Sequence, residues 1–181
     1  MQANPNDVTP SAWVTRYAPL IRAGGQVLDL ACGAGRNARW LARQGWQVEA
    51  VDRDADALAL LHGVENVQVR QADLEQEPWP YAGRSFDGIV VCRYLHRPLF
   101  PLLLQCLAEQ GVLIYETFML GQELYGRPSN PDFLLKDNEL LDYFGNKLEV
   151  VAFEQGVFHE PEPRALQRIC LRNSRVATLL A

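Results

Sequence analysis

The amino-acid sequence predicts an α/β fold: a doubly wound, mostly parallel sheet of seven strands with helices on both faces. Short apolar runs alternate along most of the chain with segments whose apolar residues have helical spacing, as parallel strands and their crossover helices do. The last two apolar runs have no helix-sized segment between them. This ending predicts a C-terminal antiparallel hairpin at one edge of the sheet.

The predicted strands are rich in Val, Ile and Leu, as expected for a sheet that is buried on both faces. They lie at residues 27–31, 47–52, 67–70, 87–92, 111–118, 148–153 and 165–171. The predicted helices begin at capping residues and several end at glycines that favour left-handed backbone. They are expected from Ser11 to Gly24, at 36–44 before Gly45, from Asp54 to Gly63, at 99–107 and from Asp137 to Phe144.

The length of 181 residues is typical of a single domain, and 48% hydrophobic with 22% charged residues is close to the globular average. We therefore predict one domain over 1–181. Residues 1–24 are expected to form a helical cover and 173–181 a frayed tail. Residues 119–136 contain two prolines and two glycines and are too long for an ordinary connection, which predicts a lid or a substrate-binding wall.

The formal net charge of -5 removes the broad attraction to phosphate backbones on which nucleic-acid binders rely, so a small-molecule substrate is favoured. The four cysteines are scattered without a C-x-x-C pair, which predicts neither a zinc site nor a redox dithiol. No signal peptide or membrane-spanning run is evident, and a cytoplasmic location is expected. The oligomeric state is not predicted.

A glycine loop, Gly33-Ala34-Gly35, follows the first strand and precedes a helix. Glycine lets the backbone turn sharply there and approach a ligand closely. With Ala38, the loop satisfies the dinucleotide pattern G-x-G-x-x-[G/A], and Asp52 stands nineteen positions after Gly33, where an acid would bind ribose hydroxyls. An NAD-binding oxidoreductase is therefore one interpretation.

Three features favour S-adenosylmethionine instead. Asp29 lies inside an apolar strand, where its burial is costly unless a donor such as a ligand ammonium group compensates it. Asp73, after the third strand, can accept a hydrogen bond from an adenine amine, with an apolar neighbour beside the ring. The helix before the first strand and the hairpin after the fifth fit methyltransferases better than dehydrogenases.

The segment 27–35, Val-Leu-Asp-Leu-Ala-Cys-Gly-Ala-Gly, resembles motif I of class I S-adenosylmethionine-dependent methyltransferases. Val51-Asp52, 72–74 (Ala-Asp-Leu) and 86–90 (Phe-Asp-Gly-Ile-Val) resemble the motifs that follow it, in order and spacing, over residues 27–118. Within this Rossmann-like superfamily the chain is similar to the small bacterial tellurite-resistance-methyltransferase-like proteins.

The resemblance implies a site for S-adenosylmethionine. Gly33 and Gly35 would lie beneath its methionine part, Asp52 would hold the ribose and Asp73 the adenine. The remaining residues expected beside the cofactor are Trp13 and Arg16 over the methionine carboxylate, Asp29, Leu74 in the adenine pocket, and Cys92.

Residues after the fourth and fifth strands are candidates for the substrate wall, because doubly wound sheets carry reacting groups at the carboxyl ends of their strands. These candidates are Arg93, Tyr94, His96 and Glu116. Glu116 could orient a substrate, act as a base, or form an ion pair with Arg93 or Arg127. In the long loop, Tyr125 and Arg127 could bind an anion or be solvated.

The sequence thus predicts a methyltransferase that moves a methyl group in line from S-adenosylmethionine to a small molecule. The alternatives are an NAD-binding oxidoreductase and a non-catalytic protein that binds S-adenosylmethionine.

Overall fold

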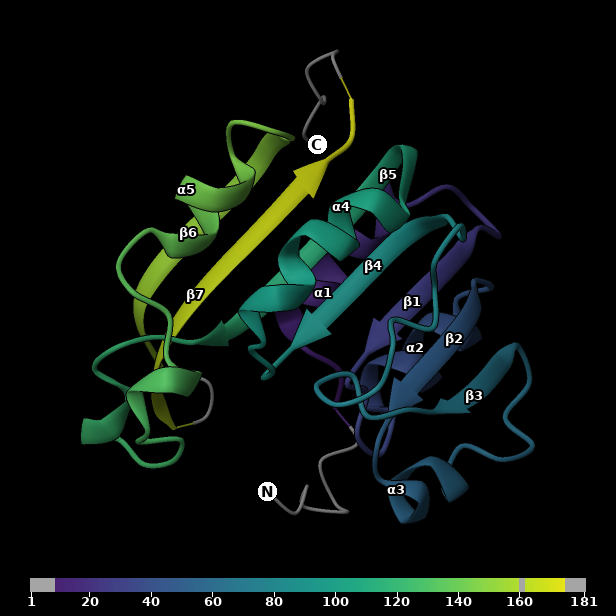
Figure 1. Cartoon of the computed structure of the whole chain (residues 1–181), viewed down its shortest axis with the longest axis horizontal. Helices are drawn as coiled ribbons and strands as arrows, with labels where there is room; N and C mark the ends of the chain where they lie inside the picture. Colours follow the sequence, from purple (N-terminus) through teal and green to yellow (C-terminus); the bar gives the residue numbers. More distant parts are fainter. Residues whose placement is uncertain (1–8, 160–161, 175–181) are drawn as a thin grey trace.

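A computed structural model describes residues 9–159 and 162–174 of the chain. Its centre is a seven-stranded sheet in the order β3-β2-β1-β4-β5-β7-β6 (Figure 1), and the predicted fold class is confirmed. The strands are β1 Gln26–Leu30, β2 Gln47–Asp52, β3 Val67–Gln71, β4 Phe86–Cys92, β5 Leu107–Phe118, β6 Glu149–His159 and β7 Pro163–Arg172. The first five strands run parallel to one another, whereas β7 is antiparallel to both β5 and β6.

The sheet has a topological switch point beside β1. The chain builds outward from β1 to β2 and β3, then returns to place β4 on the other side of β1. In open α/β sheets, ligands bind outside the carboxyl ends of the strands at such a point. The C-terminal hairpin extends the opposite half, with β7 inserted next to β5.

Helices cover both faces of the sheet (Figure 1). On one face, α1 (Ala12–Tyr17), α2 (Arg36–Arg43) and α3 (Ala55–Ala59) bury residues against β1, β2 and β4. On the other, α4 (Phe100–Cys106) and α5 (Glu139–Phe144) pack on β4, β5 and β7. Neighbouring residues of a strand point to opposite faces. In β1, Val27 and Asp29 therefore face α2, and Leu28 and Leu30 face α4.

Several predicted boundaries need correction. Asp137 is not the cap of α5; Asn138 takes that place with a φ of 58° and makes no side-chain cap bond. The helix after Asp54 ends at Ala59, well before Gly63, although Asp54 caps it as predicted. Strand, helix, strand alternation also fails between β3 and β4, where residues 72–85 form no helix.

The predicted tail is ordered at its first residue. Asn173 donates from its side chain to the carbonyls of Leu107 and Ala108, at 3.2 and 3.0 Å. Its backbone N–H donates to Gly111 at 2.8 Å. The rest of the predicted tail, from 175 onward, lies outside the described residues, as does the turn-rich segment 4–7.

The long segment 119–136 is anchored to the domain. It contains two short 3-10 helices, η3 (Gln122–Leu124) and η4 (Pro131–Phe133). The buried Gln122 accepts a hydrogen bond from the Ala165 N–H at 2.9 Å. Arg97 donates to the carbonyls of Asp132 and Leu134 at 2.8 and 3.0 Å. The Arg97 guanidinium also donates two hydrogen bonds, of 2.6 and 3.0 Å, to the Glu139 carboxylate.

Replacing Arg97 with methionine is expected to release this segment. Two carbonyls lose their donor and Glu139 loses its cation, which should cost about 1–3 kcal/mol of unfolding free energy. Limited proteolysis should then cut first within 119–136, and the thermal midpoint should fall. Arg43→Met, in the last turn of α2, is the control; equal cleavage patterns in both variants would show that Arg97 does not anchor the segment.

Among residues 9–159 and 162–174, no helix is both long enough and apolar enough to cross a membrane.

Candidate cofactor and substrate site

The glycine loop begins where β1 ends, at the switch point. Ala31, Gly33 and Gly35 have φ values of 53°, 54° and 74°, so the chain turns sharply into α2. A Cβ on Gly35 would lie 2.5 Å from the Leu61 side chain, so only glycine fits there without a shift. A Cβ on Gly33 would meet no atom of residues 9–159 and 162–174 within 4 Å. Gly33 therefore borders open space, in which a ligand can approach the backbone.

Asp29 is a buried carboxylate directly before this loop, with 1% of its surface exposed. Burial raises its pKa to about 7, against the opposing influence of the Ala38 backbone N–H and the Arg36 charge. Within the described part of the chain, its Oδ2 atom has no hydrogen-bond partner. Such an oxygen costs free energy unless a donor reaches it. The ammonium group of S-adenosylmethionine is a donor of the kind that would fit.

Asp52 joins the glycine loop to the end of β2. Its Oδ2 accepts from the Gly33 N–H at 2.7 Å, and its Oδ1 accepts from the Asp54 N–H at 3.0 Å. The carboxylate thus fixes both turns, and each oxygen keeps a further acceptor position for a ribose hydroxyl.

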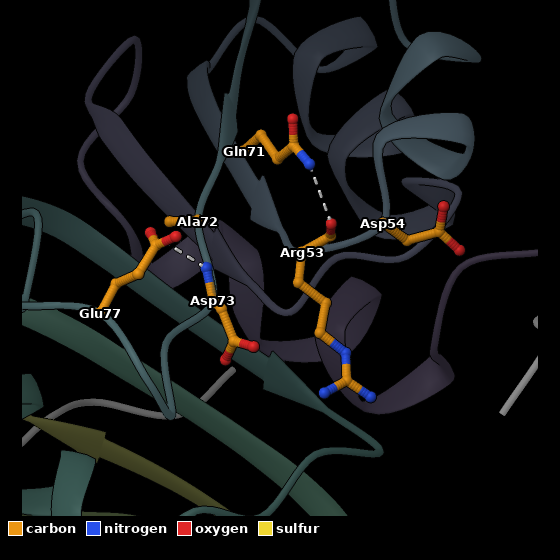
Figure 2. Close-up of a pocket in the computed structure, with 6 residues that line it drawn as sticks. All are labelled: Arg53, Asp54, Gln71, Ala72, Asp73 and Glu77. Carbon is orange, nitrogen blue, oxygen red and sulfur yellow. Dashed lines mark hydrogen bonds between the residues drawn. The ribbon is translucent and has the colours of Figure 1, made fainter.

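An open hollow of about 700 Å³ lies at the carboxyl ends of β2 and β3 (Figure 2). Its lining residues are Arg53, Asp54, Gln71, Ala72, Asp73 and Glu77. Asp73 accepts from the Glu75 N–H at 3.0 Å, and its own N–H donates to Glu77 at 3.3 Å. Asp73 lines this hollow, and Leu74 is outside the lining and packs against the core. Their expected contacts with adenine stay predictions.

On the other side of the switch point, Glu116 of β5 lies against Ser11, the N-terminal cap of α1. It is 7% exposed and accepts from the Ser11 hydroxyl at 2.9 Å. Its ion-pair partner is Arg168 of β7, whose Nε lies 3.2 Å from Oε2. The expected pairing of Glu116 with Arg93 or Arg127 is therefore wrong, because the antiparallel register places Arg168 directly opposite.

The three substrate-wall candidates after β4 have different surroundings. Arg93 is exposed, with a φ of 56°, and its backbone N–H donates to the Glu116 carbonyl at 2.8 Å. Tyr94 is half-buried, and burial, followed by the nearby Glu75 carboxylate, raises the pKa of its phenol. His96 precedes the 3-10 helix η2 (Arg97–Leu99) and makes no side-chain cap bond with it. Only Arg93 lies on the same cavity as Glu116.

That cavity, of about 320 Å³, lies between the start of α1, the start of α2 and the hairpin of β6 and β7. Its charged lining residues are Arg36, Arg93, Arg164 and Glu116, and its apolar wall includes Phe158 and Leu166. One lining residue, Arg36, directly follows Gly35 of the glycine loop in the chain.

Two predicted cofactor contacts are directed elsewhere. Trp13 is 2% exposed in the core, where its indole N–H donates to the Ile169 carbonyl at 3.2 Å. Arg16 reaches toward β6, with its guanidinium 3.8 Å from the Glu154 carboxylate. Their expected place over the methionine carboxylate stays a prediction.

Cys32 and Cys92 lie beside the glycine loop as free thiols. Burial raises the pKa of both. They are therefore protonated at neutral pH and are not activated nucleophiles. Cys92 pairs with Glu116 across β4 and β5, so its expected place at the edge of the cofactor site stays a prediction.

Sequence reasoning missed four residues of this region. They are Ser11, which donates a hydrogen bond to Glu116, the cavity-lining Arg36 and Arg164, and Arg168, which pairs with Glu116. A signal existed for Arg168, which interrupts the apolar run of β7 as Asp29 interrupts that of β1. No local pattern marks Arg36 or Arg164, because they meet only when the hairpin folds beside α2.

Comparisons with known proteins support the resemblance to methyltransferases that the motifs indicate. Residues 27–110 match the family model described as a methyltransferase domain. The chain is 56% identical over 34 residues to a ribosomal RNA small subunit methyltransferase C of Alcanivorax borkumensis. It is 38% identical over 86 residues to a ubiquinone biosynthesis O-methyltransferase of Albidiferax ferrireducens. These matches cover 19% and 44% of the chain, but only 10% and 32% of the two relatives.

The solved structure of TehB from Haemophilus influenzae has the same fold. It superposes with a TM-score of 0.73 at 21% identity, over 88% of this chain and 60% of TehB. Residues 27–110 thus match a methyltransferase domain, and the chain has the fold of the class I S-adenosylmethionine-dependent methyltransferases. The resemblance seen in the motifs is confirmed, and S-adenosylmethionine is the cofactor of that class.

Proposed function

We propose that this protein transfers a methyl group from S-adenosylmethionine to a small-molecule acceptor. The observation that carries the proposal is the buried Asp29 carboxylate, whose Oδ2 faces no donor among the described residues, directly before a glycine loop with open space at Gly33. An ammonium donor would offset the free-energy cost of burying this carboxylate, whereas NAD binding gives no reason for an acid at position 29. The antiparallel β7 also departs from the all-parallel strand order of dinucleotide-binding folds.

The position of each aspartate suggests which part of the cofactor it would bind. Asp29 would accept from the ammonium group, and Asp52 from the ribose hydroxyls while it holds Gly33 in place. Asp73 would accept from the adenine amine at the hollow. When bound, the sulfonium supplies an already activated methyl group. The protein therefore acts mainly by aligning the acceptor in line with the methyl and by excluding water.

A dedicated base is optional in this arrangement. Tyr94 does not provide a phenolate at neutral pH, because burial and the Glu75 carboxylate raise its pKa. Glu116 already accepts from Ser11 and pairs with Arg168. His96 is the remaining candidate to take a proton from a neutral hydroxyl or amine acceptor.

Calorimetric titration tests the cofactor assignment. S-adenosylmethionine and S-adenosylhomocysteine should bind, NAD should not, and Gly33→Ala should weaken binding because its methyl enters the open space at the loop. Gly63→Ala is a matched control, since Gly63 is also left-handed with nothing within 4 Å of a Cβ. Asp52→Ala should weaken binding as well.

Binding of NAD alone would overturn the proposal in favour of an oxidoreductase. Binding of S-adenosylmethionine without methyl transfer to any member of a broad acceptor library would support a non-catalytic binding protein instead.

A further inference from the structure

The charged residues that line the cavity of Arg36, Arg93 and Glu116 are mostly cationic, whereas the chain as a whole is acidic. The whole sequence has a formal net charge of -5, yet the cavity lining has three arginines, Arg36, Arg93 and Arg164, and one acid, Glu116. The acid is already committed, since Glu116 accepts from Ser11 at 2.9 Å and its other oxygen lies 3.2 Å from Arg168. The cavity lining therefore gathers three guanidinium groups, which are donors of the kind that bind carboxylate and phosphate oxygens.

The three arginines come from separate parts of the chain. Arg36 begins α2, Arg93 follows β4 with a left-handed φ of 56°, and Arg164 lies near the start of β7. Their convergence on one cavity follows from the fold and not from a charged run in the sequence. Guanidinium groups bind carboxylate and phosphate oxygens in a planar, two-pronged manner.

The opposite wall is apolar and held in place. Phe158 and Leu166 line it, and the Arg168 guanidinium stacks on the Phe158 ring, 3.8 Å from its centroid. The volume of about 320 Å³ is at the lower end of the range for small-molecule sites. One charged group and a small apolar body would fit such a site.

We infer that this cavity binds the methyl acceptor, and that the acceptor is a small organic anion. Its carboxylate or phosphate would bind Arg93 and Arg164, and its apolar part would lie against Phe158. The inference rests on the proposed function, since it takes the lining residue Arg36, which follows Gly35 in the chain, to bring the cavity near the bound methyl donor. It narrows the acceptor from any small molecule to one that carries negative charge.

Two-dimensional NMR of the full chain, saturated with S-adenosylhomocysteine, tests this inference with three probes of similar shape. Benzoate and phenyl phosphate should shift the resonances of residues lining the cavity, and neutral benzamide should bind at least about tenfold more weakly. The two anions also distinguish a carboxylate-binding site from a phosphate-binding site.

Arg93→Met and Arg164→Met should each weaken binding of the preferred anion by about tenfold or more, because charge-assisted hydrogen bonds are lost while the aliphatic stem is kept. Both should leave the affinity for S-adenosylhomocysteine unchanged. Arg43→Met removes a positive charge from the last turn of α2 and is the control.

Two results would overturn the inference while the proposed function stands. In the first, S-adenosylhomocysteine binds but neither anion binds better than benzamide. In the second, Arg93→Met and Arg164→Met weaken S-adenosylhomocysteine and not the anion, which would assign the arginines to the cofactor carboxylate. If S-adenosylhomocysteine itself fails to bind, the proposed function fails, and this result is read before any anion is added.

Discussion

Replacing Arg168 with methionine is expected to lower the free energy of unfolding by about 3–5 kcal/mol, which is a large part of the stability of an ordinary domain. The side chains of Arg168 and Glu116 are 5% and 10% exposed, and their Nε and Oε2 atoms are 3.2 Å apart. The substitution leaves the Glu116 carboxylate buried without its cation. Chemical denaturation followed by circular dichroism measures the change.

The double variant Arg168→Met/Glu116→Gln is the matched control. It removes both charges and keeps the Ser11 hydroxyl near an amide, so it should recover most of the lost stability. If the double variant is as unstable as the single one, the loss comes from packing around Phe158 and Trp13, and the ion pair is not its cause.

Cofactor affinity is expected to rise as the pH increases through about 7, because the ionised form of Asp29 binds an ammonium group better than the protonated form. Burial raises the pKa of this carboxyl from 3.8 to about 7. Calorimetry with S-adenosylhomocysteine between pH 6 and 8 measures the change. In Asp29→Asn the affinity should fall by tenfold or more, and its dependence on pH in this range should be lost.

The stability of the ligand-free protein should change in the opposite direction. A carboxyl whose folded pKa lies above its unfolded value stabilises the fold below the unfolded value, and that contribution is lost as the pH rises through the folded one. Ionisation of Asp29 should therefore lower the free energy of unfolding progressively as the pH rises from about 4 to about 7, by roughly 4 kcal/mol in total. Asp29→Asn should be more stable than the natural protein at pH 8. An equal or lower stability there would contradict the assigned cost of the buried charge.

The sequence alone predicted the parts of the site that depend on local backbone. The glycine loop could be placed because left-handed turns at Gly33 and Gly35 need glycine, and Asp52 because it ends an apolar strand at a set distance from the loop. Asp29 could be singled out because a carboxylate inside an apolar run demands a partner.

Other predictions for the site and its surroundings depend on which face of an element turns inward. Trp13 and Arg16 are near the first strand in sequence, but α1 directs them toward β6 and β7. Leu74 packs on the core, because the chain between β3 and β4 crosses the sheet without a helix. Asp137 fails as a cap because the neighbouring Asn138 adopts the left-handed turn.

By itself, the sequence determined the α/β fold class with its C-terminal hairpin and the class of chemistry, since apolar periodicity and the glycine and carboxylate motifs are local features of the chain. Only the tertiary structure decided the partner of Glu116 and the arginine-lined cavity. Arg164 and Arg168 reach the site through an antiparallel pairing of β7 with β5, and that register is set by packing between segments that are far apart in the chain.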